Sequence, residues 1–410
     1  MAAADKSSRD NTPSELRLGS LGTRVFIQAG VVGGVFLGLS LMIGLGAEDG
    51  GRQFMHSYLV AYMWTLSVAL GALWWVTLQH LVNARWSIAV RRVGELLAAN
   101  MPVLIALSLP IVIPTLFGSS TLYVWADAAH MQAEHALHHK AAYLNTGFFG
   151  VRLVLYFTVW TVLGRYFLRR SLDQDLGAGA DIVGRLRVVS APAMIAFALT
   201  LTFAAIDLLM SLDPMWFSTI FGVYYFAGCV VSVHAVFALV LVWLQRRGRL
   251  VRAVTTEHFH DIGKMLFAFI IFWAYIAFSQ FMLIWYANLP EETEWYRLRV
   301  EGPWRLVAWA LVLGHFAVPF VGLMSRHVKR HRGALAFWAV WMLALHWLDL
   351  YWLVMPALSR EHLPLGLLDL TCWLGVFGLF IASTAYHARN VNLVPTRDPR
   401  LAESLAFENV

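Results

Sequence analysis

Ten long apolar segments alternate with shorter polar connections along the chain. A helix that crosses the hydrocarbon core of a bilayer needs about 20 mostly apolar residues. The segments are residues 25–46, 56–82, 98–117, 144–167, 190–211, 217–244, 262–287, 304–324, 334–354 and 366–387. The pattern predicts an all-α polytopic membrane protein with ten spans. Its membrane domain covers residues 25–387, between polar tails at 1–24 and 388–410.

The composition supports this class of protein. The chain has 410 residues, of which 59% are hydrophobic and 14% charged, whereas about a quarter of a soluble chain is charged. The N-terminal tail carries charges of both signs and lacks the apolar core of a signal peptide, so we expect the first segment to remain as a helix. The only cysteines, Cys229 and Cys372, lie in apolar segments. Two cysteines exclude four-cysteine iron–sulfur ligation by this chain alone.

The basic residues alternate between the two sides of the predicted spans. Most of the 31 Lys and Arg residues lie in the two tails and in the connections after the second, fourth, sixth and eighth spans. The opposite side holds only Arg52, Lys140, Arg152, Arg297, Arg299, Arg305 and Arg360. Cytoplasmic connections of membrane proteins are enriched in Lys and Arg, so both termini are predicted to be cytoplasmic. The net charge of +6 is then a topology signal, and we expect no nucleic-acid partner.

Ionisable side chains inside spans are rare and usually face a bundle interior or a wet cavity, so each is a functional candidate. The candidates are Asp207, His234, His315, His346, Asp349 and Tyr351. His315 and His346 fall near the midplane, and Asp349 lies three residues beyond His346 on the same helix face. We predict a proton route through Asp207, His315, His346, Asp349 and Tyr351. The partner of Asp207 is expected on the sixth, eighth or ninth span.

A dense protonatable cluster opens the seventh span on the cytoplasmic side. It contains Glu257, His258, His260, Asp261 and Lys264. Thr256 is expected to cap the helix, and the acids suit the positive end of the helix dipole; capping explains the histidines less well. Either this cluster or His234 is the predicted cytoplasmic entrance of the route.

At the outer side, Asp213, Glu291 and Glu292 are candidates for the mouth of the route, although Asp213 before Pro214 is also typical of a turn. His135 and His139 have the spacing of helical metal ligands, but the segment favours a solvated interfacial face. No span repeats a histidine at the spacing of stacked haems. We therefore expect no catalytic residue, no metal and no cofactor in this chain.

Two further patterns concern packing. Gly30, Gly34 and Gly38 form a small-residue stripe in the first span, which allows another helix to approach closely. Packing within the protein and docking to another membrane subunit both remain open. Pro110 and Pro114 in the third span and Pro319 in the eighth are expected to bend their helices.

Three strings resemble one family. They are "SYLVAYMWTLSVALGALWWVTLQHLVNARWSIAVRRVGE" (57–95), "MSLDPMWFSTIFGVYYFAG" (210–228) and "HDIGKMLFAFIIFWAYIAFSQFMLIWYANLPEET" (260–293). They are similar to NrfD/polysulfide-reductase-type membrane subunits, and most of all to the F subunit of bacterial alternative complex III, a quinol:electron-acceptor oxidoreductase. The resemblance implies two four-helix bundles, spans 2–5 and 6–9, with spans 1 and 10 peripheral.

The resemblance also implies the setting. The partners would be a homologous C-type membrane subunit, an iron–sulfur subunit, multihaem and monohaem cytochromes c, small membrane subunits and lipid. Haem c and iron–sulfur clusters would lie in those partners, and menaquinone or its quinol in the complex. The chain itself would be a non-redox subunit of the bacterial cytoplasmic membrane that docks partners and conducts protons. The alternatives are a quinone-binding subunit in its own right or a secondary transporter.

Overall fold

The computed structural model describes residues 14–47, 51–133, 135–177 and 181–409. Within these residues the chain is mostly helical, without a β-strand, and it has ten helical spans long and apolar enough to cross a membrane. The prediction of an all-α, ten-span membrane protein is confirmed, but the third, fourth, fifth and seventh spans extend six to ten residues beyond one of their predicted bounds.

The spans follow one another in chain order and some contain more than one helical element. They are α1 (Ser20–Leu45), α2 (Arg52–Leu81), α3 with α4 (Ile88–Ala98 and Met101–Leu116), α6 (Thr146–Asp175), α7 (Asp181–Leu208), α8 (Phe221–Arg246), α9 (Thr256–Ala287), α11 with η6 and α12 (Trp304–Ala310, Leu311–Ala317 and Val318–Met324), α14 (Arg332–Val354) and α15 (Leu367–Ala388).

Short helices lie between the spans: α5 (Ala128–Ala133), α10 (Pro290–Val300), α13 (Arg326–Arg330) and, after the last span, α16 (Leu401–Leu405).

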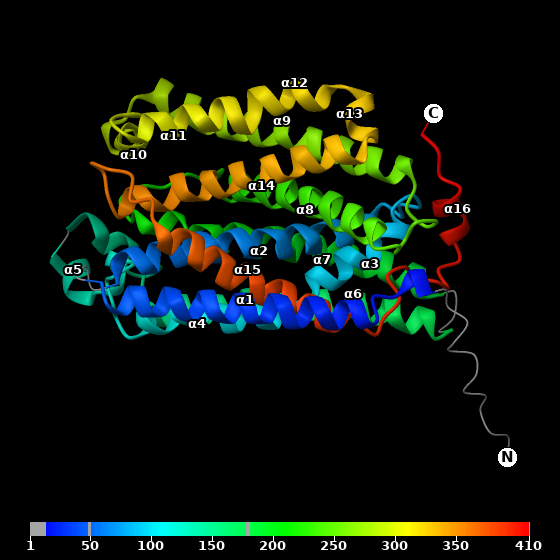
Figure 1. The fold of residues 1–410 in the computed structure, drawn as a ribbon. Helices are drawn as coiled ribbons and strands as arrows, with labels where there is room; N and C mark the ends of the chain where they lie inside the picture. The colour runs from blue at the N-terminus through cyan, green and yellow to red at the C-terminus, as the bar shows by residue number, and fades with distance from the viewer. Residues whose placement is uncertain (1–13, 48–50, 134, 178–180, 410) are drawn as a thin grey trace, which may run out of the picture.

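Helices α2 and α8 form the centre of the molecule (Figure 1). Almost all of α2 is buried, as expected for a helix that is apolar on every side. The two helices approach so closely that a Cβ at Gly71 would lie 2.1 Å from the carbonyl oxygen of Cys229. Glycine at this position therefore permits the central contact.

Eight of the spans, including this pair, pack as two groups of four. One group contains α2, α3 with α4, α6 and α7, and the other contains α8, α9, α11 with η6 and α12, and α14. Helices α1 and α15 pack against each other along their length and lie against α2 (Figure 1). This arrangement agrees with two bundles and two outer spans.

Of the glycine stripe of α1, only Gly30 faces α15, where a Cβ would lie 3.8 Å from Ala382 Cβ. The closest approach is at Gly33, where a Cβ would lie 2.6 Å from the backbone nitrogen of Leu379. No atom would lie within 4 Å of a Cβ at Gly34 or Gly38. Packing within the chain is therefore the wrong interpretation for Gly34 and Gly38, because the close approach is made one residue earlier on the helix.

Two spans change their helical form. The third span breaks at Ala99 and Asn100, between α3 and α4. The eighth widens into a π-helix, η6, directly before Pro319. A π-helical turn is rare and frequently marks a functional site, and this one contains His315.

Both described ends of the chain lie at one end of the bundle, which we call the terminal end. Gly19 donates its backbone N–H to the carbonyl of Arg389, and Arg17 pairs with Asn392 as an isolated bridge. Helix α16 lies at this end, and α10 lies at the opposite one, the α10 end (Figure 1). Two ends on one side agree with an even number of spans.

An ion-pair network fixes the C-terminal segment to the terminal end. Arg91 contacts Glu95 at 3.0 Å and Asp398 at 2.9 Å, and Arg92 contacts Glu95 and Asp175 at 2.9 Å each. Both guanidinium groups are buried. These two arginines, which contribute to the predicted charge asymmetry, thus also hold the fold together.

Candidate functional site

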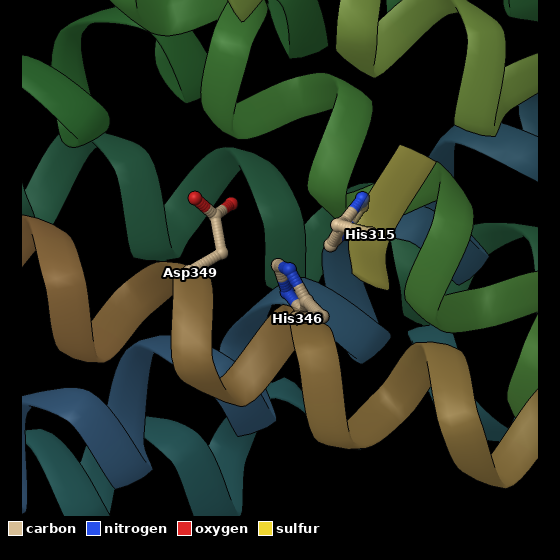
Figure 2. A group of neighbouring side chains, drawn as sticks. All are labelled: His315, His346 and Asp349. Carbon is tan, nitrogen blue, oxygen red and sulfur yellow. The ribbon is translucent and has the colours of Figure 1, made fainter. Parts of the chain in front are cut away.

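The structure brings three of the predicted route residues together in the second group of helices. His346 and Asp349 project from α14, and His315 reaches them from η6 (Figure 2). One ligand atom of each side chain lies within 4.8 Å of the others, and all three residues are buried. The i, i+3 spacing on α14 explains the shared face of His346 and Asp349. We call these residues the His–His–Asp cluster.

A glycine on α8 makes room for the imidazole of His346. A Cβ at Gly228 would lie 2.5 Å from His346 Cε1. His346 Nε2 lies 2.9 Å from Ser67 Oγ, and Ser67 donates its hydroxyl hydrogen to the carbonyl of Trp64. This arrangement assigns the imidazole hydrogen to Nε2. Nδ1, which has no partner within the described residues, is then free to accept a proton.

Asp349 is held by neutral donors. Tyr224 donates its hydroxyl hydrogen to one carboxyl oxygen, and Trp273 donates its indole N–H to the other at 3.1 Å. No Lys or Arg contacts this carboxyl within the described residues. Ionising a buried carboxyl that has no cation beside it is costly. Asp349 is therefore a candidate for proton exchange with its neighbours.

His315 completes the cluster. Its ring lies against the indole of Trp273, with 3.9 Å between ring centroids, and neither of its nitrogen atoms has a hydrogen-bond partner within the described residues. Together with His346 Nδ1, three imidazole nitrogens beside one carboxyl are open to take or give a proton. Two imidazoles and a carboxylate are also a ligand set for Zn²⁺, and one hydrogen bond on each oxygen of Asp349 leaves each oxygen a second acceptor position.

Asp207 has a different environment, and its predicted partner is wrong. Arg152, on α6, binds both carboxyl oxygens of Asp207 at 2.8 and 2.9 Å, and Tyr156 donates to it at 2.8 Å. The partner thus belongs to the fourth span, because α6 packs beside α7. The guanidinium of Arg152 also lies over the rings of Tyr143 and Phe148. A bidentate cation gives Asp207 a sufficient structural role.

His234 and Tyr351 do not join the cluster. His234 Nδ1 lies 2.7 Å from the carbonyl of Val230, and the ring of Tyr351 stacks on Trp347 and lies tilted against Trp304. Within the described residues, neither forms a hydrogen bond to the His–His–Asp cluster. Their part in a route stays a prediction.

The cluster at the start of α9 consists of ion pairs and a helix cap. Glu257 pairs with Arg330 on α13, and Asp261 with Lys264. The cap is Thr255, one residue before the predicted Thr256. Its N–H donates to His258 Nδ1 at 3.1 Å. The helix cap therefore explains His258, although capping was expected to explain the acids of this cluster better than its histidines.

The C-terminal segment lies over this cluster. Asn409 donates to Glu257 at 3.1 Å and accepts from Lys264 at 2.7 Å. His260 is buried, and its Nδ1 has no partner within the described residues. An entrance for protons at this place would therefore be covered by the chain's own tail.

The acids at the α10 end have local roles. Asp213 accepts the backbone N–H of Met215 at 3.2 Å, as in the expected turn. Glu291 and Glu292 lie in the first turn of α10, where carboxylates interact favourably with the helix dipole. His139 is exposed, and the side chain of His135 lies outside the described residues.

Four contributors to the cluster were not identified from the sequence: Ser67, Tyr224, Gly228 and Trp273. Tyr224 and Gly228 lie in one of the strings that carry the family resemblance, and Trp273 in another. Their hydrogen bonds and contacts depend on how α2, α8 and α9 are rotated against α14, and no spacing along one helix reports that rotation.

No family model and no curated protein matches this chain. The resemblance to NrfD-type subunits therefore stays a prediction.

Proposed function

We propose that this chain is a proton-conducting membrane subunit of a quinol-oxidising electron-transport complex of the alternative complex III type. It would lie in the bacterial cytoplasmic membrane with both termini in the cytoplasm. The partners would be the homologous membrane subunit, the iron–sulfur subunit and the cytochromes c named above. Electrons would pass through those partners, whereas this chain would dock them and carry protons.

The observation that supports proton conduction is the His–His–Asp cluster. Within the described residues, Asp349 has neutral hydrogen-bond donors and no cation, and three nitrogen atoms of the neighbouring His315 and His346 have no hydrogen-bond partner. In the proposed step, a proton on the Asp349 carboxyl moves to an imidazole nitrogen, which leaves a carboxylate and an imidazolium. The pair is restored when the imidazolium releases a proton and the carboxylate takes up the next one. Asp207 is left out of the proposed relay, since Arg152 neutralises it.

The experiment uses the whole complex in liposomes. Replacing Asp349 by Asn removes the exchangeable proton at nearly the same size, so we expect fewer protons released per electron with quinol oxidation retained. Glu294→Gln is the matched control, because Glu294 pairs with Arg297 one turn along α10 and both side chains are about half exposed; its ratio should equal that of the wild type. An unchanged ratio in the Asp349 variant, with normal turnover, would reject the relay.

The helix breaks bear on the transporter alternative. Transporters built from two repeats often interrupt corresponding spans of each half near the membrane midplane. Here the breaks lie in the third and eighth spans, whereas the third span would correspond to the seventh if spans 2–5 repeat as 6–9. The described interruptions therefore do not favour a transporter.

A further inference from the structure

Trp273, on α9, contacts two of the three residues of the His–His–Asp cluster. Its indole N–H donates to one carboxyl oxygen of Asp349 at 3.1 Å. The face of the same indole lies on the imidazole of His315, with 3.9 Å between ring centroids and 31° between ring planes. Trp273 is 4% exposed, and both partners are buried as well. A single neutral side chain thus lies between the acid and one of the histidines, away from water.

The indole N–H favours the ionised form of Asp349. A hydrogen bond to an ionised group is roughly twice as strong as one between neutral groups, so the carboxylate gains more from this donor than the carboxylic acid does. The indole carries no net charge, unlike the guanidinium that binds Asp207. It therefore stabilises the carboxylate without fixing it in that form.

The face of the indole favours the protonated form of His315. The face of a tryptophan ring is negative and attracts a cation that lies within about 6 Å of its centroid, most strongly where water is excluded. Neither nitrogen of His315 has a hydrogen-bond partner within the described residues, so the ring contact is a principal interaction of this imidazole. An indole that donates its N–H to a carboxylate is also polarised toward a more negative face. The two effects therefore reinforce each other.

The surroundings of His346 are different. Its imidazole lies against Gly228, where a Cβ would be 2.5 Å from Cε1, and its Nε2 lies 2.9 Å from Ser67 Oγ. Neither glycine nor serine offers a ring face to a cation. The contacts of the two histidines thus favour His315 as the residue that carries the positive charge.

We propose that Trp273 stabilises the charge-separated state of the relay, in which Asp349 is a carboxylate and His315 an imidazolium. The O–H bond of the Asp349 carboxyl breaks and an N–H bond forms on His315, so one proton moves and no electron is transferred. The ligand atoms of the cluster lie within 4.8 Å of one another, a distance that one bridging water spans. This role of Trp273 rests on the relay proposed above.

Infrared difference spectroscopy of the whole complex during turnover tests which histidine takes the proton. The readout is an imidazolium band, identified by its shift when the histidines are isotope-labelled. We expect this band in the wild type and in His346→Gln, and its loss in His315→Gln. A band that is lost in His346→Gln and kept in His315→Gln would overturn the choice of His315.

Two changes at Trp273 separate its N–H from its ring face. Trp273→Phe keeps a ring against His315 but lacks the N–H, so the band should fall at least tenfold, as for a lost hydrogen bond to a charged group. A trifluorinated tryptophan placed at residue 273 alone keeps the N–H and nearly the same shape, but its face is less negative. The band should then fall about fivefold. An unchanged band in the fluorinated protein would show that Trp273 only fills space.

Trp160, on α6, is the matched control. It is buried, lies in the other group of helices and donates its indole N–H to Thr200 Oγ1 at 2.9 Å. Trp160→Phe and a trifluorinated tryptophan at residue 160 should leave the imidazolium band at the wild-type level. A loss as large as that at Trp273 would attribute the effect to aromatic packing in general and overturn the proposal.

The same spectra distinguish a failure of this proposal from a failure of the relay. A wild type in which neither a carboxylic acid band nor an imidazolium band changes during turnover would reject the relay, and the role of Trp273 with it. Bands that change in the wild type and are equally large in both Trp273 proteins would reject the role of Trp273 alone.

Discussion

The two groups of helices each contain a buried aspartate, and the two acids are held in opposite ways. On α7, Asp207 is bound through both oxygens by Arg152, with Tyr156 as a further donor. On α14, Asp349 accepts hydrogen bonds from Tyr224 and Trp273, which are neutral and are its only donors in the described part of the chain. Both carboxyls are almost fully buried, at 1% and 2% exposure. The difference therefore lies in the partners rather than in the burial.

The comparison shows that an acid within a span is not by itself a proton carrier. A bidentate guanidinium fixes the geometry and charge of the carboxylate, and a proton could be added only by disrupting the pair. Neutral donors impose no such restriction. An acid beside open imidazole nitrogens can change its protonation state while its neighbours stay in place.

The largest expected effect comes from removing Arg152, the cation that pairs with Asp207. Arg152→Met leaves Asp207 buried without its cation, which costs about 3–5 kcal/mol. Thermal unfolding in detergent should show a strongly lowered midpoint, and Arg152→Met combined with Asp207→Leu should recover most of the loss. A single variant as stable as the wild type would remove the distinction between the two acids.

A third buried acid, Asp398 at the terminal end, is held by cations, as Asp207 is. Burial alone would raise the pKa of Asp398, but Arg91 and Arg400 outweigh burial and lower it. Its contribution to stability is then complete above the ordinary value of about 3.9 and is lost as the pH falls through the lowered pKa. Asp398→Asn should destabilise the protein by about 1.5–3 kcal/mol at neutral pH.

Unfolding midpoints measured from pH 7 downward check this expectation. The difference between the wild type and Asp398→Asn should be constant at neutral pH and shrink only in strong acid. A difference that grows as the pH falls would show that the acid is not held by its cations.

The His–His–Asp cluster depends on the space that Gly228 leaves beside the imidazole of His346. A methyl group there would lie 2.5 Å from His346 Cε1, so Gly228→Ala should displace the imidazole and cost about 1–3 kcal/mol by overpacking. We expect fewer protons per electron as well as a lowered unfolding midpoint. Gly34→Ala, where no atom lies within 4 Å, is the control and should change neither. A normal proton ratio in Gly228→Ala would show that the position of His346 is unimportant.

The smallest expected effect is the loss of one neutral donor. Tyr224→Phe removes the hydroxyl that binds Asp349 and should cost about 0.5–1.5 kcal/mol. Because the donor stabilises the ionised carboxyl, its loss should shift the pH profile of proton release toward higher pH. Tyr156→Phe beside Asp207 removes an equivalent hydroxyl and should leave that profile in place. Equal shifts in both variants would contradict the comparison.

The sequence was sufficient for the spans because each is an apolar run of the required length. It also placed His346 and Asp349 on one face, since both lie on one helix. It does not identify Arg152 as the partner of Asp207, because the distribution of charge along the chain places Arg152 on the side opposite the termini and does not report which acid it contacts. Its pairing with an aspartate 55 residues later depends on how α6 packs against α7.

The sequence also does not report which side chains pack around the His–His–Asp cluster. Tyr224 and Trp273 are ordinary aromatic residues of apolar helices, and only the rotation of α8 and α9 directs them to Asp349. The open space at Gly34 and the close contact at Gly33 differ by one residue, about 100° around the helix at 3.6 residues per turn. Apolar periodicity does not resolve such a rotation in a span that is apolar on every side.

Infrared difference spectroscopy of the complex during turnover tests the central claim most directly. If Asp349 exchanges a proton and Asp207 does not, the wild type shows a carboxylic acid signal that changes during turnover. The signal disappears in Asp349→Asn and remains in Asp207→Asn. A signal that persists in Asp349→Asn, or that is lost only in Asp207→Asn, would contradict the assignment of the two acids.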